Sequence, residues 1–270
     1  RFVNTRSIHD APSMRRGKTS VFETLVSSAG SGGVSNSRAG LLNVCLPFAR
    51  ARWPQACVLC GARAGGSTLC APCKADLPWL PRERCTVCAL PLATGEVCGT
   101  CLAHPPLFDR VVVPFAYRFP VAQLIHALKY GGRLALARTL GEALARAVPQ
   151  DVDAIVPMPL ARRRLVERGF NQALEIASVV AERTGVPLAR GAVRKVVDTP
   201  PQAALPWGER ARNVRRAFVC DADLAGARIA VVDDVLTTGA TLNELARVLH
   251  KGGAASVAGW VVARTPIESA

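Results

Sequence analysis

The stretch IAVVDDVLTTGATL, residues 229–242, is the most informative part of this chain. Apolar residues lead to two adjacent carboxylates, Asp233 and Asp234, and a Thr-Thr-Gly sequence follows shortly after them. Strands of parallel sheets are near-continuous apolar runs, and ligands bind at the carboxyl ends of such strands. We therefore expect the two aspartates at the carboxyl end of a buried strand, where a ligand can reach them.

The residues after the aspartates suit a phosphate. A helix is predicted to begin here, and the amides and dipole at a helix N-terminus attract anions. Thr237, Thr238 and Thr241 can add hydroxyl donors, and Gly239 lets the backbone approach closely. Carboxylates accept hydrogen bonds from vicinal hydroxyls, so a ribose 5-phosphate would satisfy both features. The structural alternative is a capped turn in which Asp234 accepts from backbone amides.

The segment VVDDVLTTGAT resembles the motif with which type I phosphoribosyltransferases bind 5-phosphoribosyl-1-pyrophosphate (PRPP). The resemblance implies that Asp233 and Asp234 hold the ribose hydroxyls as the catalytic pair, and that residues 236–241 hold the 5-phosphate. It also implies Mg²⁺ bound with PRPP. The substrate-binding residues would be Val235, Leu236, Thr237, Thr238, Gly239, Ala240 and Thr241.

Eight of the ten cysteines form four Cys-x-x-Cys pairs, in two halves of matching spacing. Each half offers four thiolates, which is the ligand set of a structural Zn²⁺ site. The sequence therefore predicts a double zinc ribbon that binds one or two Zn²⁺ ions, although pairing across the two halves stays open. The expected metal ligands are Cys57, Cys60, Cys70, Cys73, Cys85, Cys88, Cys98 and Cys101.

Strand and helix patterns alternate after the cysteines. Strands are expected at 109–117, 153–159, 228–234 and 256–264, and helices at 121–130, 134–148, 171–185 and 240–253. This alternation is typical of an α/β fold with a parallel sheet covered on both faces. We predict three regions: a disordered or mis-started extension at 1–40, a double zinc ribbon at 41–106, and a parallel-sheet, type I phosphoribosyltransferase-like domain at 107–270.

Three further segments, HALKYGGR, RGFNQA and QAALPWGERARNVRRAF, together with the cysteines, resemble the ComF family of competence-associated, phosphoribosyltransferase-like proteins. The resemblance covers about residues 41–265. It adds Lys129, Arg210 and Arg212 as candidate site residues, although a plain helix-end cation is an alternative for Lys129. In the phosphoribosyltransferase superfamily the loop after the first core strand receives pyrophosphate, which makes Arg164 and Arg168 candidates for that group. A link to DNA uptake and the competence machinery is also implied.

The formal net charge of +14 favours anionic partners such as phosphates or nucleic acid, although a solvated basic surface would give the same number. No apolar run is long enough to cross a bilayer, so we expect no membrane insertion and a cytoplasmic protein. Two functions remain open. One is an enzyme that transfers a phosphoribosyl group with Mg²⁺-assisted release of pyrophosphate, and the other is a non-catalytic single-stranded DNA-binding protein. We expect removal of Zn²⁺ to unfold residues 57–101 without altering the nucleotide site.

Overall fold

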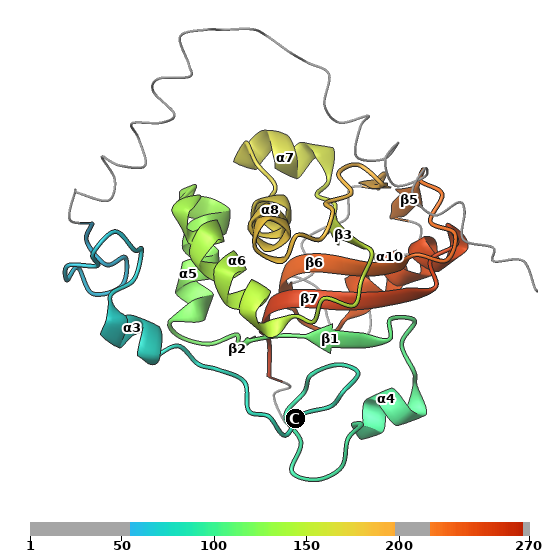
Figure 1. The fold of residues 1–270 in the computed structure, drawn as a ribbon, viewed down its shortest axis with the longest axis horizontal. Helices are drawn as coiled ribbons and strands as arrows, with labels where there is room; N and C mark the ends of the chain where they lie inside the picture. Colours follow the sequence, from blue (N-terminus) through green and yellow to red (C-terminus); the bar gives the residue numbers. More distant parts are fainter. Residues whose placement is uncertain (1–54, 198–216, 267–270) are drawn as a thin grey trace, which may run out of the picture.

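The structure is a computed structural model, and it describes residues 55–197 and 217–266. Two short helices lie in the cysteine-rich region, α3 (Ala71–Ala75) and α4 (Gly99–Ala103). They are followed by β1 (Arg110–Val112), β2 (Phe115–Ala116), α5 (Val121–Gly131), α6 (Ala135–Ala147), β3 (Ala154–Pro157), α7 (Arg162–Arg168), α8 (Gln172–Thr184), β4 (Val193–Lys195), β5 (Phe218–Cys220), β6 (Arg228–Leu236), α10 (Ala240–Lys251) and β7 (Ser256–Arg264) (Figure 1). Among the described helices, none combines the length and the apolar character needed to cross a membrane.

A five-stranded sheet forms the centre of the described part of the chain. Strands β1, β7, β6 and β3 are neighbours in that order, and β2 also pairs with β7. All of these pairings are parallel. The two longest strands, β6 and β7, are paired so that Asp233 lies opposite Val261. The predicted α/β fold with a parallel sheet is confirmed.

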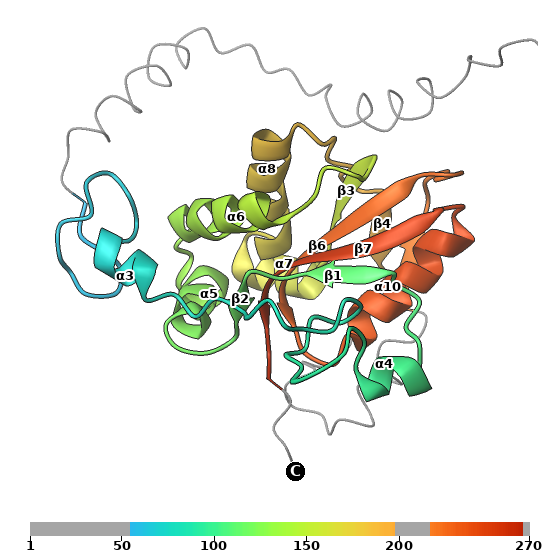
Figure 2. The same ribbon diagram turned by 60° about the horizontal axis from the view of Figure 1, so that its bottom comes forward.

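Helices cover both faces of this sheet. Ala230 and Val232 of β6 pack in the cluster that contains α5, α6 and α8, whereas Ile229 and Val231 pack in the cluster that contains α10. Figure 2 shows α10 on one side of the strands and α6 and α8 on the other. Because successive side chains of a strand point to opposite faces, the two aspartates that follow Val232 are directed to opposite faces as well.

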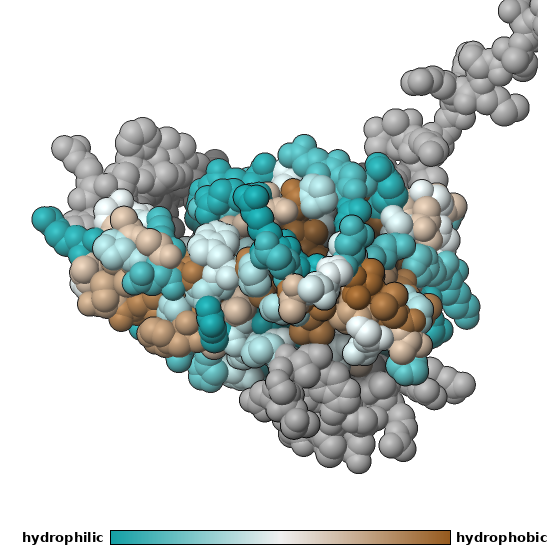
Figure 3. All heavy atoms as spheres, turned by 90° about the horizontal axis from the view of Figure 1, so that it is seen from below, coloured by the Kyte–Doolittle hydropathy of each residue, from teal (hydrophilic) through white to brown (hydrophobic). Residues whose placement is uncertain are grey.

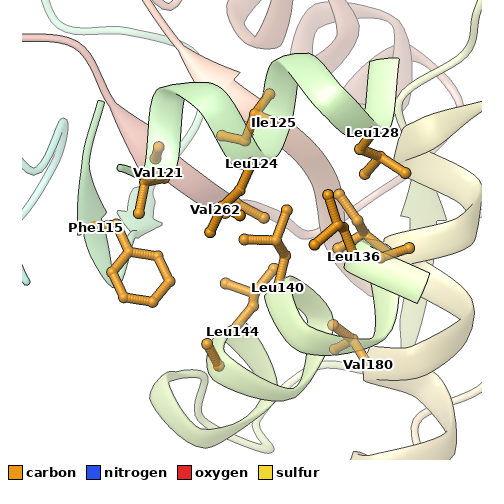
Figure 4. Close-up of a cluster of buried hydrophobic side chains, with 14 of the residues drawn as sticks. Phe115, Val121, Leu124, Ile125, Leu128, Leu136, Leu140, Leu144, Val180 and Val262 are labelled. Carbon is orange, nitrogen blue, oxygen red and sulfur yellow. The ribbon is translucent and has the colours of Figure 1, made fainter. Parts of the chain in front are cut away.

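The core cluster that contains α5, α6 and α8 fixes the position of α5. The buried side chains of α5 recur at helical spacing, and they point toward those of α6 and toward Val262 of β7 (Figure 4). Full burial of one such aliphatic side chain contributes roughly 1.5–3 kcal/mol. The helix ends at Gly132, whose φ of 62° is the left-handed conformation that glycine adopts readily. The packed helix therefore holds Lys129, in its last turn, at a defined place next to the sheet.

Some elements differ from the sequence prediction. The arginine-rich segment expected to be a loop forms the helix α7, in which Arg163 and Glu167 pair at 2.8 Å one turn apart. The strand expected at 109–117 is divided into β1 and β2, with Pro114, which has no amide hydrogen to donate, between them. The antiparallel pair β4 and β5 was not predicted. The helices at 121–130, 134–148, 171–185 and 240–253 are present within a few residues.

The cysteine-rich region consists of two copies of one unit. Helix α3 follows Cys70, helix α4 follows Cys98, and isolated bridges join Ala56 to Arg63 and Arg84 to Pro91 at equivalent places. The first unit lies beside α5 and α6, and the second lies below β1 and beside α10 (Figures 1 and 2). The expected internal repeat is confirmed. The predicted extension at 1–40 lies outside the described residues, and the domain boundary near residue 106 stays a prediction.

The surface mixes polar and apolar residues. On the face seen in Figure 3, apolar residues occur in several areas between hydrophilic ones. Single exposed apolar side chains are ordinary on folded proteins and need no explanation. The large aromatic side chain of Tyr130, at the end of α5, is 65% exposed.

Candidate functional site

The first part of the candidate site lies where β6 leads into α10. Asp233, Thr237, Gly239 and Thr241 line one small cavity of about 40 Å³, with Val235, Leu236, Leu242 and Val261. The parallel pairing of β6 with β7 and β3 puts this cavity at the carboxyl edge of the sheet. The structure therefore brings Asp233 together with the threonine loop, residues 235–241, as the sequence suggested.

The threonine loop has the geometry of a helix N-terminus. Gly239 has a φ of 80°, and α10 begins at the next residue. The amide of Ala240 donates to Thr238 Oγ1 at 3.2 Å, and the amide of Asn243 donates to the Gly239 carbonyl at 2.8 Å. The dipole of a helix favours negative charge at this end. The loop can therefore receive an anionic group beside the carboxyl of Asp233.

Asp234 points to the other face of the sheet, where it meets Lys129. Its Oδ2 lies 2.7 Å from Lys129 Nζ, and the two side chains are 5% and 21% exposed. Burial alone would lower the pKa of Lys129, but the charge of Asp234 and its hydrogen bond to the ammonium outweigh this effect and raise it. The ammonium therefore stays charged and compensates the charge of Asp234. Asp234 is not among the described residues that line the small cavity of Asp233.

The electrostatics of the pair favour binding of hydroxyl donors or cations. Asp233 Oδ1 accepts a hydrogen bond from the amide of Asp234 at 2.8 Å. Burial, and next the charge of Asp234, raise the pKa of Asp233 to about 8, against the lowering effect of Lys129. A carboxyl of this kind retains a proton near neutral pH. A ligand that brings positive charge or hydrogen-bond donors would favour its ionised form.

A second, larger cavity of about 600 Å³ lies between the end of α5 and α7. It brings together Lys129, Arg164 and Arg168, and its other lining residues are Tyr130, Gly131, Gly132, Glu167 and Phe170. The guanidinium of Arg168 lies 5.0 Å from the centre of the Tyr130 ring. We call this the basic cavity, after its three cationic residues. Lys129 lines the basic cavity and also contacts Asp234, so it links the cavity to the acidic pair.

Two of the predicted residues, Arg210 and Arg212, lie outside the described residues, so the structure does not place them. Arg162 lines a different cavity, of about 430 Å³, with Pro157, Asn171 and Arg194. The consecutive arginines therefore face different sides of α7, as expected for neighbours on a helix.

The cysteines form two sequential tetrads rather than pairs across the halves. Cys57, Cys60, Cys70 and Cys73 make one, and Cys85, Cys88, Cys98 and Cys101 make the other, with the four sulfur atoms of each within 4.8 Å of one another. The Sγ atoms of Cys60 and Cys70 are 3.6 Å apart, as are those of Cys88 and Cys98. Sulfur ligands about 2.3 Å from Zn²⁺ in a tetrahedron would be about 3.8 Å apart, so both tetrads fit structural Zn²⁺.

The first cysteine of each tetrad has a lowered pKa, which favours its thiolate form. Burial raises its pKa, but backbone amides that donate to its sulfur more than offset this effect. The pKa of Cys57 is lowered to about 6 by amides that include those of Cys60 and Cys70. The pKa of Cys85 is lowered to about 7 by amides that include those of Cys88 and Cys98. Thiolates are the species that bind metal, so the turn amides support coordination.

One residue close to the site, Arg264, is not among the predicted site residues. It ends β7, and its Nη1 donates to the carbonyls of Leu236 and Thr237, at the start of the threonine loop. Its signal in the sequence is weak: a single cation at the end of an apolar strand usually reaches solvent.

Comparison with known proteins agrees with this architecture. Residues 48–102 match the family described as Double zinc ribbon domain, and residues 171–269 match the family described as Phosphoribosyl transferase domain. The glutamine PRPP amidotransferase from Bacillus subtilis, a solved structure, is 22% identical over 46% of this chain and 25% of that chain, with a TM-score of 0.33. That score is too low to support any inference.

Two relatives are similar to this chain over about two thirds of its length or more. The DNA utilization protein YhgH of Salmonella typhimurium is 36% identical over 194 residues, which is 67% of this chain and 84% of that protein. Competence protein F of Haemophilus influenzae is 32% identical over 208 residues, which is 73% of this chain and 90% of that protein. With this identity over most of each relative, the chain belongs to the ComF family, which joins a double zinc ribbon to a phosphoribosyltransferase-like domain.

Proposed function

We propose that the chain binds PRPP with Mg²⁺ and transfers the phosphoribosyl group to an acceptor, with release of pyrophosphate. The observation that carries the proposal is the shared cavity of Asp233 and the threonine loop at the carboxyl end of β6. A carboxylate accepts from sugar hydroxyls, and the N-terminus of α10 favours a phosphate. A ribose 5-phosphate presents both groups at once.

The basic cavity supports the pyrophosphate end of the same ligand. Lys129, Arg164 and Arg168 line it, and cations aimed at a leaving pyrophosphate stabilise the charge that develops on it. Mg²⁺ would arrive on the phosphates of PRPP as part of the substrate. In our proposal, pyrophosphate draws the ammonium of Lys129 away from Asp234, and this exposes the Asp234 carboxylate to a ribose hydroxyl. The ion pair would then hold the carboxylate ready until PRPP arrives.

A second candidate function is binding of single-stranded DNA without turnover. The exposed ring of Tyr130, with Arg168 over it at 5.0 Å, lies at the rim of the basic cavity. Aromatic rings and guanidinium groups stack on nucleobases, and a basic groove tracks the phosphates. The names of the relatives, which refer to DNA utilization and competence, support a role in DNA uptake for either candidate.

The test is calorimetry of PRPP with Mg²⁺, on the wild-type chain and on a variant with both Asp233→Ala and Asp234→Ala. We expect the double variant to lose PRPP binding and to keep a salt-sensitive affinity for single-stranded DNA. Asp221→Ala is the matched control, since Asp221 is an exposed carboxylate paired with Arg194. Absence of PRPP binding by the wild type would refute the first candidate.

Turnover is tested by a separate screen for release of pyrophosphate, with bases, amines and DNA ends as acceptors. Tyr130→Ala distinguishes the two candidates. It should weaken DNA binding by about 1–3 kcal/mol if one base stacks on the ring, and it should weaken PRPP binding by less than this, because Lys129, Arg164 and Arg168 all remain in the cavity. Equal loss of both affinities would mean that the two ligands share one site.

A further inference from the structure

A buried guanidinium lies between the second zinc ribbon and the threonine loop. Arg264 is 3% exposed, and its Nε donates to the carbonyl of Cys88 at 3.1 Å. Its Nη1 donates to the carbonyl of Leu236 at 3.0 Å and also to the carbonyl of Thr237. One side chain therefore joins the turn that carries a metal ligand to the backbone from which the loop begins.

The guanidinium of Arg264 lies beside the second cysteine tetrad. Its hydrogen-bond acceptors are four carbonyl oxygens, including that of Thr265, and the hydroxyl of Thr265. A buried cation is costly unless opposite charge lies near it. Four thiolates around one Zn²⁺ leave a net negative charge, and Cys88 belongs to such a set. A metal-loaded second tetrad therefore stabilises the guanidinium in the position where it holds the loop.

The chain that leaves the second ribbon makes further contacts with the same region. The Leu107 amide donates to Asn243 Oδ1 at 2.6 Å, and the Leu107 carbonyl lies 2.9 Å from Nε2 of His250, so both contacts reach α10. A Cβ atom built on Gly239 would lie 3.5 Å from the ring of Phe108. The loop is therefore held from the ribbon side by packing as well as by hydrogen bonds.

The turn of the second ribbon that contains Cys88 and Ala89 packs against the core beside α10, and its backbone is strained. Ala89 has a φ of 58°, where the equivalent residue of the first ribbon is Gly61 with a φ of 76°. A left-handed conformation is sterically unfavourable for a residue other than glycine. Ala89 is 1% exposed and belongs to the core cluster that contains α10. Its packing therefore offsets the strain and fixes the adjacent Cys88 carbonyl.

The first ribbon offers an internal comparison, because it lies on the other face of the sheet. Cys57 and Cys70 belong to the cluster around α5 and α6, and the hydroxyls of Thr68 and Thr139 form a hydrogen bond with each other. Figure 1 shows α3 beside α5 and α4 on the other side of the molecule. The two tetrads therefore have the same ligands but different neighbours.

We propose that Arg264 is a positioning residue that couples the second zinc ribbon to the threonine loop. Zinc in the second tetrad and an anion on the loop then strengthen each other's binding, by the same factor in both directions. The identity of that anion as PRPP rests on the proposed function, but the effect of zinc on the loop does not. This coupling departs from the independence of ribbon and nucleotide site expected from the sequence.

The decisive experiment measures amide hydrogen exchange of residues 236–243 in the full chain without ligand. It compares wild type with Cys98→Ser, Arg264→Met and Arg264→Lys, and uses Cys60→Ser in the first ribbon as the matched control. We expect about tenfold faster exchange in Cys98→Ser and Arg264→Met, no change in Cys60→Ser, and faster exchange in Arg264→Lys as well, since one ammonium cannot reach the same carbonyls. Equal exchange in Cys98→Ser and Cys60→Ser would overturn the proposal.

A second measurement requires no variant of the second ribbon, so it remains valid if such variants do not fold. A chromogenic chelator reports the rate of zinc release from Cys60→Ser, whose remaining intact tetrad is the second one. PRPP with Mg²⁺ should slow this release about tenfold, and Arg264→Lys should remove the protection. Failure of PRPP to bind at all in calorimetry would refute the proposed function alone. Binding of PRPP without protection of the zinc would refute the coupling.

Discussion

Replacement of Lys129 by methionine tests the ion pair beneath the candidate site. Lys129 Nζ lies 2.7 Å from Asp234 Oδ2, and the Asp234 side chain is 5% exposed. Removing one partner of a buried pair costs about 3–5 kcal/mol, because the other charge is left without compensation. Lys129 is itself 21% exposed, so water can partly replace it. We therefore expect a loss at the lower end of that range, about 3 kcal/mol.

The assay is urea and thermal unfolding with zinc present, followed by circular dichroism. For a domain of this size, a loss of about 3 kcal/mol corresponds to a fall in Tm of about 6–12 °C. Addition of Asp234→Asn to Lys129→Met should recover most of the loss, since the neutral amide requires no counter-charge. Arg138→Met is the control, because its pair with Glu142 is exposed and worth less than about 1 kcal/mol.

The reasoning is refuted if Lys129→Met costs no more than Arg138→Met. It is also refuted if Asp234→Asn recovers nothing, because the lost stability would then come from packing of the lysine side chain and not from the buried charge.

Three further predictions concern the residues around this pair. With its pKa raised to about 8, Asp233 keeps a proton in the folded protein that the unfolded chain releases near pH 4. The free energy of unfolding should therefore fall as pH rises between these values, by at most about 1.4 kcal/mol per pH unit. Thermal melts of Asp233→Asn should lack this slope, and an unchanged slope would contradict the assignment. Gly239→Ala should cost roughly 1–2 kcal/mol and weaken PRPP binding in calorimetry, because its φ of 80° is a left-handed conformation that alanine adopts only with strain; wild-type affinity would argue against a role of this turn. Gly259→Ala should cost about 1–3 kcal/mol in urea unfolding, since its Cβ would lie 2.6 Å from Leu242 Cδ2, and wild-type stability would show that α10 has room to move.

The sheet and the position of the aspartates could be predicted because buried parallel strands have a strong apolar pattern. The run that ends at Asp233 and Asp234 is short, apolar and rich in β-branched residues, which favours a buried strand, and the glycines at 132 and 185 end the helices where expected. The cysteine repeat was equally readable, since spacing alone separates a zinc ribbon from scattered thiols.

Other features depend on contacts that a linear pattern does not show. Helix α7 was missed because three consecutive arginines resemble a basic loop, although Arg163 and Glu167 have the spacing of a helical ion pair. The buried ion pair of Asp234 could not be predicted in the same way, because its partner, Lys129, belongs to an element 105 residues earlier in the chain. Arg264 was missed for the same reason, since its acceptors are backbone carbonyls.

The burial of Ala89 and of the Arg264 side chain has a practical consequence for dissecting this protein. A truncation that begins near residue 107 would uncover the apolar patch that Ala89 fills and would leave a guanidinium without its acceptor at Cys88. Such a fragment should aggregate when expressed alone, whereas a fragment that keeps residues 81–106 should aggregate less. We therefore expect that the phosphoribosyltransferase-like domain needs the second ribbon for its solubility, and that a shortened chain should keep both.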